Sequence, residues 1–212
     1  MSIITLKNQP ISNRFLYQPT HKPECFDFEL IFNEKLGCIS LKSPFPINKL
    51  RPLYDWITCF EPEDHLDELV DKISNLENIS KSSIIGAFSF KDDSTLNRLN
   101  KIGFKNTWRI DPKNDLKIPF KTFSIETIQD YFNNNILNYH QKSDIFIARH
   151  VIEHSYDIMK FIKISSQIVK KDGYLIFELP DCERAMLAGD CTILWEEHIN
   201  YFTESSFKKL IK

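Results

Sequence analysis

Apolar runs of strand length alternate with amphipathic segments from residue 82 onward. Five apolar runs share this pattern: residues 84–90, 107–111, 120–124, 144–151 and 174–179. Three segments between them carry apolar residues at helical spacing: residues 95–102, 126–138 and 158–169. Short apolar strands separated by helices of this length are typical of a parallel sheet that is covered on both faces. We therefore predict an α/β domain in this part of the chain.

The first 76 residues follow a different pattern. The runs 26–32 and 37–41 predict a hairpin, and an amphipathic lead-in helix completes the segment. We expect a small α+β N-terminal module over residues 1–76 and a Rossmann-like domain over residues 77–212. The last amphipathic pattern starts near Thr203 and is cut off by the chain end, so we expect the second domain to be truncated.

The amino-acid composition limits the kinds of molecule that the protein is expected to bind. The net charge is −2 and both signs are interspersed, which argues against a dedicated nucleic-acid or acidic-membrane surface. No apolar run approaches the roughly 20 residues that span a bilayer, and the first residues do not resemble a signal peptide. The five cysteines are widely spaced and form no C-x-x-C pair, so we expect free thiols in a reducing cytoplasm. A small-molecule partner fits these features, and the oligomeric state stays open.

Residues suited to acid/base chemistry follow the fourth and fifth predicted strands. His150 and His154 come at the end of the fourth strand, and Glu197 and His198 come after the fifth. Carboxyl ends of parallel strands meet at one edge, so we expect His154, Glu197 and His198 to face one pocket. A histidine near neutral pKa beside a carboxylate suits general acid/base catalysis. The alternatives are a histidine bonded to a local carbonyl or to Glu153, and an ordinary charged loop.

The segments that would meet a nucleoside are less regular. Asp111 ends the second predicted strand, where such folds place a carboxylate for ribose hydroxyls, although a loop acid before Pro112 is the alternative. Gly86 is the single glycine in the loop region after the first strand. Asp92 and Asp93 occupy the following helix start, which disfavours a pyrophosphate. The pattern thus disfavours NAD and FAD and leaves a zwitterionic or cationic ligand open.

Three stretches together carry a family resemblance: His-Val-Ile-Glu-His at 150–154, Gly-Tyr-Leu-Ile-Phe-Glu-Leu-Pro at 173–180, and Glu-His-Ile-Asn-Tyr-Phe at 197–202. They resemble class I S-adenosylmethionine-dependent methyltransferases. The likeness is closer to the sugar C-methyltransferase type, which acts on nucleotide-linked ketosugars. It covers about residues 8–212, and the Glu-His-x-x-Tyr-Phe element is its most specific part.

The resemblance implies roles for seven residues and S-adenosylmethionine as the cofactor. The cofactor-binding residues would be Gly86, Asp111 and His150. The catalytic residues would be His154, Glu197, His198 and Tyr54, the last contributed by the N-terminal module or, alternatively, packed between the two parts. Methylation at carbon needs an enolate, which a histidine steadied by a carboxylate can form. The sulfonium methyl group is already electrophilic, so this chemistry requires no metal.

The sequence departs from the family pattern in three places, and these departures suggest other possible functions. Asn33-Glu-Lys-Leu-Gly37 stands where the family has a zinc-binding C-x-x-C-G, so we expect no metal in the module. His150 and His154 also lack the partner glutamate of metallopeptidases. The cofactor loop is poor in glycine, and the family's C-terminal domain is absent. A degenerate methyltransferase fold that binds a ligand or partner without catalysis is therefore the main rival, and a nucleotide-sugar reductase is disfavoured because no Gly-x-Gly-x-x-Gly turn is present.

Overall fold

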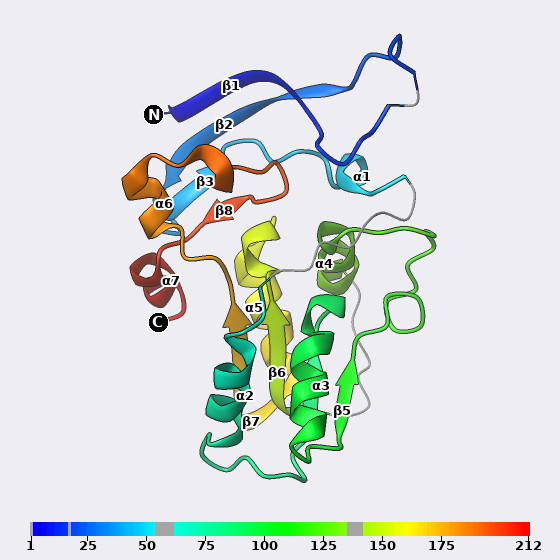
Figure 1. The fold of residues 1–212 in the computed structure, drawn as a ribbon, viewed down its shortest axis with the longest axis vertical. Helices are drawn as coiled ribbons and strands as arrows, with labels where there is room; N and C mark the ends of the chain where they lie inside the picture. Colours follow the sequence, from blue (N-terminus) through cyan, green and yellow to red (C-terminus); the bar gives the residue numbers. More distant parts are fainter. Residues whose placement is uncertain (1, 17, 54–61, 135–141) are drawn as a thin grey trace.

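The computed structural model describes residues 2–16, 18–53, 62–134 and 142–212. Two four-stranded sheets build the fold, one antiparallel and one parallel (Figure 1). The antiparallel sheet has the order β1-β2-β3-β8, and its strands are β1 (Ser2–Pro10), β2 (Cys25–Asn33), β3 (Cys38–Leu41) and β8 (Asn200–Tyr201). The parallel sheet has the order β5-β4-β6-β7, and its strands are β4 (Ile85–Ala87), β5 (Thr107–Arg109), β6 (Ser143–Arg149) and β7 (Val169–Glu178). The predicted α/β class with a Rossmann-like parallel sheet is confirmed.

Helices cover both faces of the parallel sheet. Along β6, Ile145 and Ile147 face one side and Phe146 and Ala148 face the other, as the two-residue period of a strand requires. Helices α2 (Leu66–Ser74) and α3 (Asp93–Lys101) pack on the first side, and helices α4 (Ile125–Asn134) and α5 (Ile158–Ile168) pack on the second. No helix in the described ranges is long and apolar enough to cross a membrane.

The N-terminal sheet starts from the predicted hairpin, which is confirmed. β2 and β3 pair antiparallel from Leu30 opposite Leu41 to Asn33 opposite Cys38. The turn closes because Asn33 Oδ1 accepts hydrogen bonds from the backbone of the next residues and Gly37 takes a left-handed φ of 65°. A helical turn, α1 (Ile47–Leu50), follows this sheet.

The chain returns to the N-terminal sheet after it has completed the parallel one. Ser40 of β3 pairs with Asn200 of β8, and Ile39 pairs with Tyr201. Tyr201 is buried in the same apolar cluster as Phe28 of β2. The elements α6 (Glu183–Ala188), η3 (Cys191–Ile193) and α7 (Glu204–Leu210) flank this return. The domain boundary near residue 76 stays a prediction, and the β3–β8 pairing links the two sides of it.

The expected strand over residues 120–124 is wrong, because this segment is a loop. Phe120 lies beneath the guanidinium group of Arg51, 4.0 Å from its ring centroid. Thr122 Oγ1 donates a hydrogen bond to the carbonyl of Pro52. The aromatic residues that suggested a strand therefore serve contacts with the N-terminal part, and the parallel sheet has four strands rather than five.

Candidate active site

The site begins where β6 ends. His150 adopts a left-handed backbone with φ of 49°, which is uncommon for a residue with a side chain. Its N–H donates to the carbonyl oxygen of Glu178 at the end of β7, 2.8 Å away. This turn leads directly into the 3₁₀ turn η2 (Ile152–His154), in which Glu153 and His154 are both buried.

His154 is held by a carboxylate from another helix. Its Nδ1 lies 2.5 Å from Oε1 of Glu126, which stands in the first turn of α4, and both side chains are buried. Burial acts to lower the pKa of His154, but the charge and hydrogen bond of Glu126 raise it above its ordinary value. Burial acts to raise the pKa of Glu126, but His154 holds it below its ordinary value. The close contact therefore favours the charged form of each group, an imidazolium beside a carboxylate.

His198 stands beside His154 in an edge-to-face contact, with ring centroids 4.9 Å apart. The adjoining chain is fixed to η2, because Ile199 N–H donates to the Glu153 carbonyl and Asn200 Nδ2 donates to the Ser155 carbonyl. Burial and the charge of His154 lower the pKa of His198 to about 4. The two histidines lie side by side as expected, but His198 lines the neighbouring cavity and His154 is buried behind it. His198 is neutral at pH 7.

Glu197 points into the same cluster. One carboxylate oxygen lies within 4.8 Å of potential ligand atoms of Glu126 and His154. Burial and the charge of Glu126 raise the pKa of Glu197 to about 7. Asn13, from the N-terminal part, donates a hydrogen bond of 2.9 Å to Glu197 Oε1. A carboxyl group that titrates near neutral pH can both accept and return a proton.

A cavity of about 330 Å³ adjoins this cluster. Its wall contains five polar or charged residues, His65, Lys91, His150, Glu153 and His198, together with two prolines. The volume lies at the lower end of the range for small-molecule sites, roughly 300–1,000 Å³. The cavity opens beside the carboxyl ends of β6 and β7, which is the edge where open α/β sheets bind ligands.

A family model described as a methyltransferase domain matches residues 90–212, which is 123 of 212 residues and thus more than half of the chain. The chain belongs to this family. Membership supports a class I S-adenosylmethionine-dependent methyltransferase, and it leaves the sugar C-methyltransferase type as a prediction. No curated protein matches the chain.

A second cluster of polar side chains in this methyltransferase domain contains Asp92, Arg149 and Glu178. It lies at the carboxyl ends of β4, β6 and β7, beside the point between β4 and β6 where the strand order reverses. Asp92 is fully buried and accepts hydrogen bonds from the N–H groups of Ser89 and Arg149. The guanidinium of Arg149 donates to both carboxylate oxygens of Glu178 and to the Lys91 carbonyl. Burial alone would raise the pKa of Glu178, but hydrogen bonds from His150, Arg149 and His65 hold it well below its ordinary value. Burial raises the pKa of Asp92 to about 7.

The predicted cofactor residues of the methyltransferase lie at three different places. Asp111 is exposed, and its carboxylate accepts from the N–H groups of Lys113 and Asn114, so it caps its own turn. Gly86 is inside β4, where a Cβ atom would lie 2.6 Å from the Trp108 ring. Its lack of a side chain thus serves packing. His150 Nε2 lies 3.1 Å from Glu178 Oε1. The ligand roles of all three stay predictions, and Tyr54 lies outside the described residues.

Sequence reasoning missed the carboxylate that holds the site histidine. We expected Glu197 to steady a histidine, whereas in the described residues Glu126 bonds His154 and Glu197 bonds Asn13. The sequence did not mark Glu126 as a site residue, because an acid in the first turn of a helix is usually exposed and interacts with the helix dipole. It could have marked Arg149 and Glu178, since each is a charged residue that ends an apolar strand.

Proposed function

We propose that this methyltransferase domain transfers the methyl group of S-adenosylmethionine to a carbon next to a carbonyl group, in a nucleotide-linked sugar. The observation that carries the proposal is the His154–His198 pair beside the cavity, with ring centroids 4.9 Å apart. Acceptors such as oxygen or nitrogen nucleophiles need at most one base. A cluster with a cationic histidine, a neutral histidine and a carboxyl group of near-neutral pKa suits removal of a carbon-bound proton.

The charges at the sheet edge fit the cofactor that the family implies. S-adenosylmethionine carries a zwitterionic amino acid, and Glu178, whose side chain is 19% exposed, would accept its ammonium group, while the buried Arg149 holds the Glu178 carboxylate in place. Asp111 is exposed beyond β5 and would meet the ribose hydroxyls. When bound, the cofactor supplies an electrophilic methyl group on a sulfonium.

The chain's own residues would manage the proton. His154 is cationic through its bond to Glu126, so it would stabilise negative charge on the enolate oxygen. The neutral imidazole of His198 and the carboxyl group of Glu197 are the candidate acceptors of the proton. Glu197 is the better matched to neutral pH, because its pKa is about 7 and that of His198 is about 4.

Two measurements test the proposal. Calorimetric titration with S-adenosylmethionine and its demethylated product tests the cofactor, and absence of binding at millimolar cofactor would exclude methyl transfer by this chain. Incubation with nucleotide-linked ketosugars in deuterated water tests the acid/base group. We expect deuterium to enter next to the carbonyl, and Glu197→Gln should slow this exchange roughly 10²-fold or more. Unchanged exchange in this variant would contradict the assignment of Glu197.

A second candidate function is binding without catalysis, and the Arg149 side chain favours it. Arg149 crosses the point where the strand order reverses, and its guanidinium is already bonded to Glu178 and to the Lys91 carbonyl. The turn after β4 offers no glycine for close backbone approach. This function predicts that nucleotide-linked sugars raise the unfolding temperature while S-adenosylmethionine does not.

A further inference from the structure

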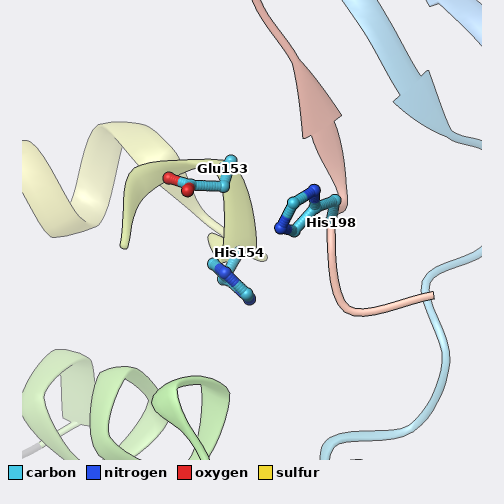
Figure 2. A group of neighbouring side chains, drawn as sticks. All are labelled: Glu153, His154 and His198. Carbon is cyan, nitrogen blue, oxygen red and sulfur yellow. The ribbon is translucent and has the colours of Figure 1, made fainter. Parts of the chain in front are cut away.

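We propose that Glu153, His154 and His198 bind one divalent transition-metal ion of the zinc type beside the cavity. These three side chains come together from η2 and from the segment before β8 (Figure 2). The inference goes beyond the proposed methyl transfer, and a bound ion would occupy the ring nitrogens of His154 and His198 to which that proposal gives roles with the proton. It also departs from our expectation that the chain holds no metal.

The donor atoms are close enough to converge on one ion. One potential ligand atom from each residue lies within 4.8 Å of the others. Ligands at about 2.0–2.2 Å in tetrahedral geometry stand roughly 3.3 Å apart, so each atom needs to move inward by about 1 Å. Two imidazoles and one carboxylate form a donor set that suits Zn²⁺ and leaves a fourth position open.

The carboxylate of Glu153 is the independent observation that points to a cation ligand. Glu153 is 3% exposed, and within residues 2–16, 18–53, 62–134 and 142–212 neither of its oxygens has a hydrogen-bond partner. His150 Nδ1 lies 3.6 Å from Oε1, which is within ion-pair distance when His150 is protonated but beyond hydrogen-bond distance. Burial of a carboxylate without such bonds is costly unless it is paired or coordinates a metal. A bound ion would satisfy both oxygens.

Glu126 provides the outer support that metal-binding histidines usually have. It bonds Nδ1 of His154, so the nitrogen left for an ion is Nε2. Carboxylate–histidine pairs of this kind fix the ring and raise its basicity toward the metal. The second oxygen of Glu126 is also buried and accepts no hydrogen bond from the described residues.

The cavity supplies the entry path. Glu153 and His198 both line it, so an ion can reach them and the open position would face the cavity. Lys91 lines it as well and carries a positive charge. Glu126, Glu153 and Glu197 each place a carboxylate oxygen within 4.8 Å of a ring nitrogen of His154.

Titration of the chelator-treated full chain with Zn²⁺ tests the inference. We expect one ion per chain, and Glu153→Gln and His198→Ala should each weaken binding by more than roughly 100-fold. Glu126→Gln should weaken it by about 10–100-fold, as loss of an outer partner does. His65→Gln is the matched control, because His65 lines the same cavity without belonging to the donor set, and it should leave affinity unchanged. Circular dichroism checks that each variant is folded.

Cobalt substitution separates this site from the cysteines. The Co²⁺ form should show ligand-field bands without a thiolate-to-metal charge-transfer band. A thiolate band, or full zinc affinity in both Glu153→Gln and His198→Ala, would place the ion elsewhere and overturn the inference. Absence of stoichiometric zinc binding by the wild-type chain would also overturn it. The cofactor titration is separate, so loss of cofactor binding leaves the zinc site standing, whereas stoichiometric zinc binding would assign His154 and His198 to the ion and leave Glu197 to take the proton.

Discussion

The two polar regions at the carboxyl edge of the sheet differ in how fully their hydrogen bonds are made. In the region between β4 and β6, both oxygens of Asp92 accept backbone N–H groups, and Arg149 donates to Glu178 and to the Lys91 carbonyl. In the histidine region, both oxygens of Glu153 and one oxygen of Glu126 have no hydrogen-bond partner among the described residues. The two regions are connected through His150, which contacts Glu178 and faces Glu153.

This difference separates stability from function. Buried polar groups whose hydrogen bonds are all made rigidify a structure. Buried groups without hydrogen bonds are rare, and a bound ligand, local strain or a catalytic role usually explains them. We therefore assign the region around Arg149 to holding β4, β6 and β7 together. The histidine region is the one arranged to receive something from the cavity.

The largest expected effect is on turnover, in the histidine region. His154→Gln removes the cation that would stabilise the enolate, and we expect turnover to fall roughly 10²–10⁴-fold with little change in affinity for S-adenosylmethionine. Steady-state kinetics and calorimetry on the same preparation measure the two quantities. An equal loss of cofactor affinity would show that His154 serves binding rather than proton transfer.

The next effect concerns stability, in the paired region. Arg149→Met removes a side chain that is 2% exposed and leaves Glu178 without its main ion-pair partner, so we expect a loss of about 3–5 kcal/mol in the free energy of unfolding. Arg109→Met is the matched control, because Arg109 pairs with Asp93 near the surface and should lose less than about 1 kcal/mol. Urea unfolding measures both, and similar losses would contradict the distinction.

A substitution of Asp111 tests whether its carboxylate binds the cofactor or only caps its own turn. Asp111→Ala removes the cap of its own turn, and if the carboxylate also holds the ribose it should weaken S-adenosylmethionine binding by roughly 1.5–3 kcal/mol. Calorimetry measures this affinity. A variant that loses stability while it binds the cofactor normally would restrict Asp111 to the turn.

The pH dependence of stability gives a smaller effect with a defined sign. Burial raises the pKa of Glu197 in the folded chain to about 7, above the value of 4.5 for an unperturbed glutamate. The folded state therefore binds this proton more tightly, and the stability that it contributes below about pH 4.5 is lost as the pH rises through 7. Relative to wild type, Glu197→Gln should gain roughly 1–3 kcal/mol between pH 5 and pH 8. A constant difference across this range would contradict the raised pKa.

Periodicity predicted the parts of the fold that repeat, and it could not predict contacts between distant segments. The apolar runs that became β4, β6 and β7 are long or regular enough to be read, and so is the β2–β3 hairpin. β8 has only two residues, too few to show any period, yet its pairing with β3 brings His198 to η2.

The candidate site shows the same limit. His154 and His198 were predictable neighbours because each follows a strand of one parallel sheet. Glu126 and Asn13 reach the cluster from α4 and from the loop after β1, and nothing in their local sequence marks them. Phe120 and Phe123 suggested a strand because they alternate with polar residues. Such alternation does not reveal whether the rings pack within a sheet or against another part of the chain.

The most direct test of the distinction between the two regions applies one substitution to each. Glu178→Gln and Glu153→Gln both replace a carboxylate by an amide of the same shape. The free energy of unfolding at pH 7 should fall by at least about 2 kcal/mol for Glu178→Gln, since Arg149 would be left buried without its charge partner. For Glu153→Gln it should change by less than about 1 kcal/mol, since the lost attraction to His150, His154 and His198 is offset by easier burial. Equal losses in the two variants would contradict the account, because Glu153 would then be as fully paired as Glu178.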